Sequence, residues 1–212
     1  MRVIPRLYPI LDTALLEKLR FPAIAAAEAM LEAGAGILQW RCKGHVSRHA
    51  LREAERIAQL CWQSGALFVV NDRADIARIL HAGVHVGQDD LPPAVAREIA
   101  GPEALLGFST HNANQLMEAA DAPADYLALG PIFGTTSKAN PDPVVGLENL
   151  RAWRLLTGRP LVAIGGIDRL HARSVLAAGA DSIALIRDLI PEEPSKDSIR
   201  RRTEEWLHLL SP

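Results

Sequence analysis

Residues 128–138 read Ala-Leu-Gly-Pro-Ile-Phe-Gly-Thr-Thr-Ser-Lys, and residues 163–167 read Ala-Ile-Gly-Gly-Ile. In both stretches an apolar, strand-like run stops abruptly at glycine, and in the first the glycines are followed by hydroxyl residues and Lys138. Glycine lets a backbone approach an anion closely, hydroxyls donate hydrogen bonds and lysine supplies positive charge. A β/α barrel builds phosphate pockets in this way at the carboxyl ends of its strands. The two stretches therefore predict a barrel that binds a phosphorylated small molecule.

Around these stretches, short apolar runs alternate with longer amphipathic segments. The predicted strands are Leu7–Asp12, Gly36–Lys43, Leu67–Asp72, Val84–Gly87, Ala104–Thr110, Tyr126–Phe133, Leu161–Ile167 and Ser182–Ile186. The predicted helices between them include Ile24–Ala33, Ser47–Ser64, Asn112–Ala120, Leu147–Thr157 and Leu170–Ala178, and a closing helix follows residue 190. Eight β/α units in 212 residues predict one domain over residues 1–212, a single (β/α)8 TIM barrel of the α/β class. The alternative is an open, doubly wound sheet, but no Gly-x-Gly-x-x-Gly follows an early strand.

The ends of the helices carry recognisable signals. Ser47 and Asn112 are predicted N-caps, because their side-chain oxygens can accept hydrogen bonds from the first helical N–H groups. Glycines are predicted to end five helices, at Gly34, Gly65, Gly83, Gly158 and Gly179.

The net charge, the cysteine content and the lengths of the apolar runs exclude several classes of function. The formal net charge is only −2, so no strong basic balance indicates nucleic acid, and Arg200–Arg202 beside acidic residues is interpreted as a solvated helix face. Cys42 and Cys61 lack zinc spacing and are too few for a disulfide framework. No signal peptide and no apolar run near the roughly 18 residues of a membrane span is found, so we expect a cytoplasmic protein without a membrane partner. A homo-oligomer stays open.

Polar side chains gather at the predicted strand ends, where a barrel places its functional groups. Asp72 and Asp90 end neighbouring strands and offer the oxygen ligands that suit Mg²⁺ together with a substrate phosphate. Arg41 and Lys43 share a strand face, because strand side chains alternate with period two, and suit the remaining charge of a di- or triphosphate. Asn71 adds an amide donor. This set favours metal-assisted departure of a phosphate-type leaving group, without a covalent intermediate.

Structural interpretations of the same residues stay open. An Asn-Asp pair after a strand is often a turn or an N-cap, and strand-end cations are often merely solvated. His85, within an apolar strand, is predicted to be a hydrogen-bonded core residue. Trp40 and Cys42 should point away from the barrel interior.

The order of motifs resembles the thiamine phosphate synthase family from Leu7 to about Ile190. The matching pieces are Leu7-Tyr8-Pro9-Ile10-Leu11-Asp12, Gln39-x-Arg41-x-Lys43, Asn71-Asp72-Arg73, Gly83-Val84-His85-x-Gly87-Gln88-x-Asp90, Gly107-Phe108-Ser109-Thr110-His111, Asp125-Tyr126, Gly130-Pro131-Ile132-Phe133, Thr135-x-Ser137-Lys138 and Ala163-Ile164-Gly165-Gly166-Ile167.

The resemblance implies a transferase of thiamine biosynthesis that uses two small-molecule substrates. It would couple 4-amino-5-hydroxymethyl-2-methylpyrimidine diphosphate with 4-methyl-5-(2-phosphoethyl)thiazole, giving thiamine phosphate and diphosphate. By resemblance, Asp72 and Asp90 would hold Mg²⁺, and the diphosphate would meet Arg41, Lys43, Asn71 and Lys138. Gln39 and Ser109 would hold the aminopyrimidine, while Thr135, Ser137 and the Gly166 backbone would receive the thiazole phosphate. Among these, Arg41, Lys43, Ser109 and Lys138 would be the catalytic residues.

Four positions depart from the family pattern. Cys42 replaces an acidic residue, Ser137 replaces a threonine, Leu11 replaces a threonine, and Arg187 stands near a serine usual in the last strand. Arg187 either adds a phosphate contact or alters the pocket. Three alternatives remain: the related thiazole tautomerase, with His111 as an acid-base group, a sugar-phosphate isomerase, and a non-catalytic barrel that binds thiamine precursors.

Overall fold

Eight parallel strands close into a barrel in the computed structural model, which describes residues 3–135 and 142–211. The strands pair in chain order, and the last returns to the first through the register Leu7↔Ile183. They are β1 (Leu7–Asp12), β2 (Ile37–Arg41), β3 (Leu67–Asn71), β4 (Gly83–Val86), β5 (Leu106–Thr110), β6 (Tyr126–Leu129), β7 (Leu161–Ile164) and β8 (Ser182–Leu185). The predicted (β/α)8 TIM barrel is therefore confirmed.

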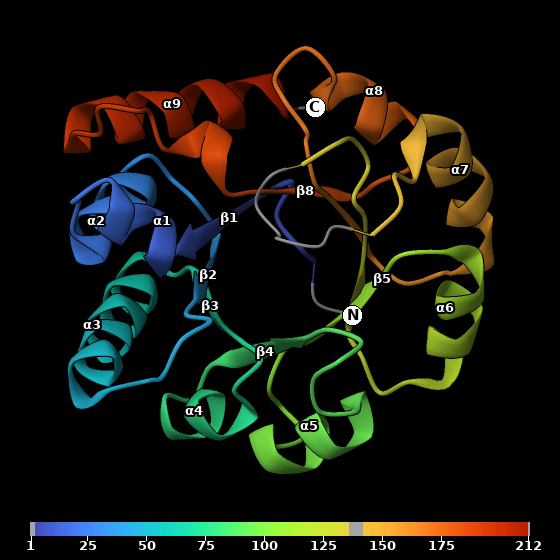
Figure 1. Cartoon of the computed structure of the whole chain (residues 1–212), viewed down its shortest axis with the longest axis horizontal. Helices are drawn as coiled ribbons and strands as arrows, with labels where there is room; N and C mark the ends of the chain where they lie inside the picture. Colours follow the sequence, from blue (N-terminus) through green and yellow to red (C-terminus); the bar gives the residue numbers. More distant parts are fainter. Residues whose placement is uncertain (1–2, 136–141, 212) are drawn as a thin grey trace.

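Helices surround the barrel on its outer side (Figure 1). They are α1 (Thr13–Lys18), α2 (Ala23–Glu32), α3 (Arg48–Ser64), α4 (Ala74–Ile79), α5 (Pro93–Ala100), α6 (Ala113–Glu118), α7 (Gly146–Trp153), α8 (Ala172–Ala177) and α9 (Lys196–Leu209). Short 3-10 turns extend three connections, at Ala119–Asp121, Arg154–Leu156 and Arg187–Leu189. Of the helices described, none is both long and apolar enough to cross a membrane.

The alternation of strand side chains creates two apolar layers. The larger layer lies between strands and helices and contains Trp40, whose Nε1 donates to Glu53 Oε1 on α3 at 3.3 Å; Cys42 packs against it. The smaller layer fills the barrel interior and includes Tyr8 and Tyr126. Trp40 and Cys42 thus face outward as predicted, and the interior is left to the residues that form the site.

Most predicted helix ends are confirmed. Ser47 Oγ accepts from Ala50 N at 3.2 Å, and Asn112 Oδ1 accepts from Gln115 N at 3.0 Å. Gly65 ends α3 in the left-handed region, with φ +73°. The left-handed glycines Gly34 and Gly179 likewise follow the last turns of α2 and α8.

Two glycine predictions are wrong. Gly83 opens β4, where an added Cβ would lie 2.8 Å from Leu105 O, so glycine permits the close approach of β4 and β5. Gly158 has no left-handed φ and ends no helix, because the turn Arg154–Leu156 closes on Thr157 instead.

Candidate active site

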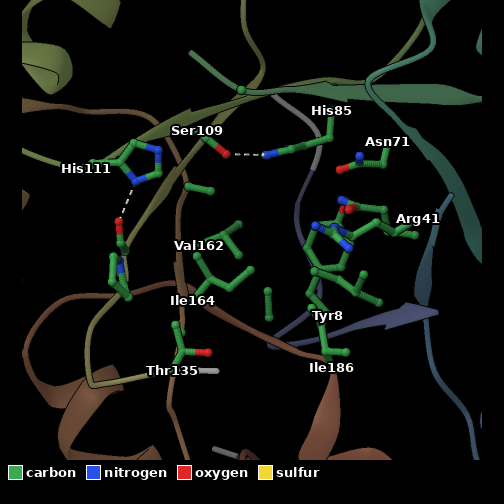
Figure 2. Close-up of a pocket in the computed structure, with 18 of the residues that line it drawn as sticks. Tyr8, Arg41, Asn71, His85, Ser109, His111, Thr135, Val162, Ile164 and Ile186 are labelled. Atoms are coloured by element: carbon green, nitrogen blue, oxygen red, sulfur yellow. Dashed lines mark hydrogen bonds between the residues drawn. The ribbon is translucent and has the colours of Figure 1, made fainter. Parts of the chain in front are cut away.

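A cavity of about 730 Å³ opens at the carboxyl ends of the strands. Figure 2 shows side chains from several strands pointing into it. Among its lining residues are those that the sequence predicts for the site: Gln39, Arg41, Lys43, Asn71, Asp72, Asp90, Ser109, Thr135 and Gly166. The predicted residues Ser137 and Lys138 lie outside the described residues.

Both cations of β2 and the loop that follows it are paired with carboxylates. Lys43 Nζ lies 2.6 Å from Asp72 Oδ2, and Arg41 is hydrogen-bonded to Asp12. Asp12 also accepts from Leu15 N at 2.9 Å, which caps α1 and fixes this carboxylate. Both cations are therefore held at the mouth of the cavity, each by one carboxylate partner.

Asp72 and Asp90 interact with each other at the ends of β3 and β4. Burial raises the pKa of Asp72; the hydrogen bond from Lys43 opposes this shift, and the hydrogen bond with Asp90 adds to it. Burial also works to raise the pKa of Asp90, but hydrogen bonds with Asp72 and with the Gly87 N–H outweigh it, so this pKa is lowered. Gly87 N donates to Asp90 Oδ2 at 2.8 Å. Two carboxylates thus share one small volume, an arrangement that a cation would stabilise.

Asn71 ends β3 with an unpaired amide. Its side chain is buried, yet Nδ2 is the one buried side-chain nitrogen or oxygen of the described residues without a hydrogen-bond partner. An unpaired buried donor costs about 1–3 kcal/mol, so a water or a ligand oxygen placed beside Asn71 Nδ2 would stabilise this position. Because Asn71 lines the cavity, its amide is available to an acceptor bound there.

A chain of hydrogen bonds crosses the barrel interior beneath these charges. Gln39 Nε2 donates to Tyr8 Oη at 3.0 Å, and Tyr8 Oη lies 2.7 Å from Tyr126 Oη. Tyr126 Oη lies 3.0 Å from His85 Nδ1, and His85 Nε2 lies 2.8 Å from Ser109 Oγ. The prediction that His85 is a hydrogen-bonded core residue is confirmed. The two tyrosines were not predicted as site residues, although a phenol facing a barrel interior needs a partner, and that is the signal that could have found them.

The opposite side of the cavity is lined by backbone. Gly165 and Gly166 follow β7 with φ +96° and +65°, and an added Cβ at Gly166 would lie 2.4 Å from Gly134 O. Glycine is therefore required where the loops after β6 and β7 touch. Arg187 lines the cavity from the turn after β8 and is exposed.

His111 helps to hold the loop after β6. Its Nδ1 lies 2.6 Å from Gly130 O, a contact drawn in Figure 2, and 3.5 Å from Asp142 Oδ2. This contact gives His111 a structural role, since a carbonyl oxygen accepts and Nδ1 must donate.

Cations, paired carboxylates and a glycine-lined pocket at the strand ends define the class of β/α-barrel enzymes that act on phosphorylated small molecules. The chain belongs to the thiamine monophosphate synthase family, whose sequence model matches residues 7–189. A thiamine-phosphate synthase of Koribacter versatilis is 47% identical over 213 residues, covering 98% of this chain and 96% of that protein.

Further comparisons agree with this membership. A thiamine-phosphate synthase of Laribacter hongkongensis is 46% identical over 164 residues, covering 77% of each chain. The solved structure of thiamine phosphate pyrophosphorylase from Pyrococcus furiosus superimposes with a TM-score of 0.84 at 35% identity, covering 97% of this chain and 95% of that one. The resemblance derived from the motifs is thus confirmed.

Proposed function

We propose that this chain is a thiamine phosphate synthase, which joins 4-amino-5-hydroxymethyl-2-methylpyrimidine diphosphate to 4-methyl-5-(2-phosphoethyl)thiazole and releases diphosphate. One observation carries the proposal: the same cavity is lined by charged and amide side chains at the ends of β2–β4 and by glycines at the ends of β6–β8. In a barrel whose strands pair in chain order, these two groups of strands face each other. Two phosphorylated substrates can therefore enter with their phosphates apart and their rings together.

The diphosphate would bind at the end formed by Arg41, Lys43 and Asn71. The two cations would exchange their carboxylate partners for phosphate oxygens, and the unpaired Asn71 Nδ2 would gain its acceptor. By the family resemblance, Lys138 would add a further cation. These donors stabilise the negative charge that builds on the leaving oxygen, so they act as catalytic residues as well as binding residues.

Asp72 and Asp90 would hold Mg²⁺. Their direct interaction, and the burial that raises the pKa of Asp72, fit a site in which a cation takes the place of a shared proton. No cluster of three or more His, Cys, Asp or Glu suited to a metal occurs in residues 3–135 and 142–211, so the remaining ligands would be diphosphate and water oxygens. Bound there, Mg²⁺ would neutralise charge on the departing diphosphate.

Bond breaking would precede bond making in this reaction. The bond between the pyrimidine methylene carbon and the diphosphate oxygen breaks, and its electron pair leaves with the diphosphate. The electron-rich aminopyrimidine stabilises the resulting cation, and the thiazole nitrogen donates its lone pair to the same carbon. No protein nucleophile or general base is needed.

The remaining site residues position the two rings. Gln39 and Ser109 would hold the aminopyrimidine, and Thr135, Ser137 and the Gly166 backbone would receive the thiazole phosphate. Apolar side chains of the lining, among them Ile10, Val162 and Ile164, exclude water that would otherwise capture the cation.

The test is formation of thiamine phosphate and diphosphate by the purified protein, with each substrate and Mg²⁺ omitted in turn. The proposal requires product only when all three are present. Binding of the thiazole phosphate without any product would refute it and favour the tautomerase or a non-catalytic binding protein.

A further inference from the structure

The buried relay is the chain of hydrogen bonds that runs through Gln39, Tyr8, Tyr126, His85 and Ser109. In each of its links one atom must donate a proton and the other must accept it. The first link fixes the direction of donation, because the Gln39 Nε2 amide can only donate and Tyr8 Oη must accept. A phenol has one proton, so Tyr8 gives its proton to Tyr126 Oη at 2.7 Å. Tyr126 in turn gives its proton to His85 Nδ1 at 3.0 Å. Each phenol then has one donor and one acceptor, and neither is left unsatisfied.

The direction of the relay determines the tautomer of His85. Since Nδ1 accepts from Tyr126, a neutral imidazole carries its proton on Nε2 and donates it to Ser109 Oγ at 2.8 Å (Figure 2). Burial lowers the pKa of His85 to about 4, so the ring is neutral at pH 7. A phenol is also a stronger acid than a neutral imidazole N–H, which favours the phenol as the donor in the Tyr126–His85 pair.

The two ends of the relay consequently differ in what they present to the cavity: one end is a hydrogen-bond donor and the other is an acceptor. Ser109 Oγ accepts from His85, so its own hydroxyl proton is left to donate into the cavity, and Gln88 Nε2 steadies the Ser109 backbone carbonyl at 2.6 Å. Gln39 uses Nε2 for Tyr8, which leaves Oε1 as an acceptor at the same cavity.

We propose that His85, Tyr8 and Tyr126 are positioning residues that make Gln39 an acceptor and Ser109 a donor, and so select a 4-aminopyrimidine over a 4-oxopyrimidine. The inference rests on the proposed function. An aminopyrimidine offers an amino group, which can donate to Gln39 Oε1, and a ring nitrogen, which can accept from the Ser109 hydroxyl. A 4-oxopyrimidine places a carbonyl oxygen where the amino group donates, so the contact with Gln39 Oε1 would fail, because two acceptors cannot share a hydrogen bond. Sites built on buried hydrogen bonds discriminate strongly against analogues that leave such a group unpaired.

The tautomer of His85 is measured by ¹⁵N NMR on the whole protein at pH 7 without substrates. The expected result is a proton on Nε2 of His85, while His111 shows a protonated Nδ1 because it donates to Gly130 O at 2.6 Å. In Tyr126→Phe, His85 Nδ1 loses its donor and the two tautomers should mix. In Tyr8→Phe, Tyr126 still donates to His85, so this tautomer should persist. A proton on Nδ1 of His85 in the unmodified protein would overturn the proposal.

Discrimination is measured as the ratio of kcat/KM for the aminopyrimidine diphosphate and its 4-oxo analogue. Tyr126→Phe and Tyr8→Phe should each lower this ratio about tenfold, the scale of one hydrogen bond lost. Thr110→Val is the matched control, since Thr110 Oγ1 is a buried hydroxyl of β5 that donates to Ala128 O at 2.9 Å, outside the relay. Ratios equal to that of the unmodified protein in both tyrosine variants, with the fold intact by circular dichroism, would refute the positioning role.

The two proposals fail in different ways. If the unmodified protein forms no thiamine phosphate, the proposed function is wrong, whereas the ¹⁵N result still decides the direction of the relay. In that case calorimetric binding of the amino and oxo pyrimidine alcohols replaces kcat/KM. Equal affinity for both alcohols would then refute the selection.

Discussion

Asp72→Asn separates the folding role of this carboxylate from its proposed metal role. Asp72 lies just after β3 with φ +64°, a region that asparagine tolerates as readily as aspartate, so the substitution removes charge without new backbone strain. The ion pair that it breaks involves Lys43, whose side chain is 50% exposed, and pairs of this kind contribute at most about 1 kcal/mol. Burial raises the pKa of Asp72, which means that the folded protein holds the ionised form at a cost. We therefore expect the free energy of unfolding at pH 7 to fall by less than about 1 kcal/mol, or to rise.

Activity should respond very differently to Asp72→Asn. Loss of one of two carboxylate ligands should raise the Mg²⁺ concentration for half-maximal activity at least about 100-fold, since even residues that only support metal ligands contribute 10–100-fold. The assay quantifies thiamine phosphate by chromatography over a Mg²⁺ series, and urea unfolding supplies the stability. Asp89→Asn is the control, because Asp89 is an exposed carboxylate lining the same cavity. An unchanged Mg²⁺ requirement in Asp72→Asn, or an equal change in Asp89→Asn, would refute the metal assignment.

Four further outcomes are expected. Gly166→Ala should lower the unfolding free energy by about 2 kcal/mol and raise KM for the thiazole phosphate, because φ is +65° and the new Cβ would meet Gly134 O; an unchanged KM in steady-state kinetics would contradict the phosphate contact. Arg187→Ser should raise the same KM about tenfold without changing kcat, and a lower KM would instead show that Arg187 obstructs the pocket. Folding lowers the pKa of His85 from 6.5 to about 4, so between these pH values the unfolded chain binds a proton that the folded protein does not. The unfolding free energy should therefore fall by about 3 kcal/mol as the pH drops from 6.5 to 4. In His85→Gln, urea unfolding should show a pH dependence that lacks this contribution. Trp206→Ala should lower the unfolding free energy by about 3–5 kcal/mol, because the ring is fully buried and Nε1 donates to Asp188 at 2.6 Å; a urea-measured loss below about 1 kcal/mol would contradict a structural role for α9.

The fold was predictable because apolar periodicity and chain order together specify a barrel, and Leu7–Asp12 has the predicted bounds. Strand ends were less predictable, since apolar residues continue past the last ladder residue. β6 ends at Leu129 rather than Phe133, because Pro131 lacks an N–H to donate to the ladder, yet Ile132 still packs in the core. β7 ends at Ile164 rather than Ile167, because Gly165 and Gly166 adopt left-handed φ values. Apolar sequence therefore marks burial, while backbone geometry marks the end of a strand.

The charged part of the site was predictable for a different reason. A barrel brings every strand end to one rim, so polar residues at successive ends, such as Arg41, Asn71 and Asp90, had to meet there. The buried relay was not predictable in this way. Tyr8 and Tyr126 are 118 residues apart, and their contact depends on the stagger of strands across the barrel interior, which no local pattern records. Sequence thus identifies which residues reach the site, and only the closed structure shows which of them touch.

The charges at the mouth of the cavity connect these observations to the proposed chemistry. Arg41 and Lys43 are balanced by Asp12 and Asp72, so Asp90 and its exposed neighbour Asp89 leave negative charge in excess when all of these groups are ionised. Such a rim does not attract a diphosphate by itself, because its cations already have partners and its net charge is negative. A divalent cation at Asp72 and Asp90 would offset that excess and make Lys43 available to phosphate. The proposed requirement for metal and the proposed binding of diphosphate would then have one physical origin, the shared carboxylate pair.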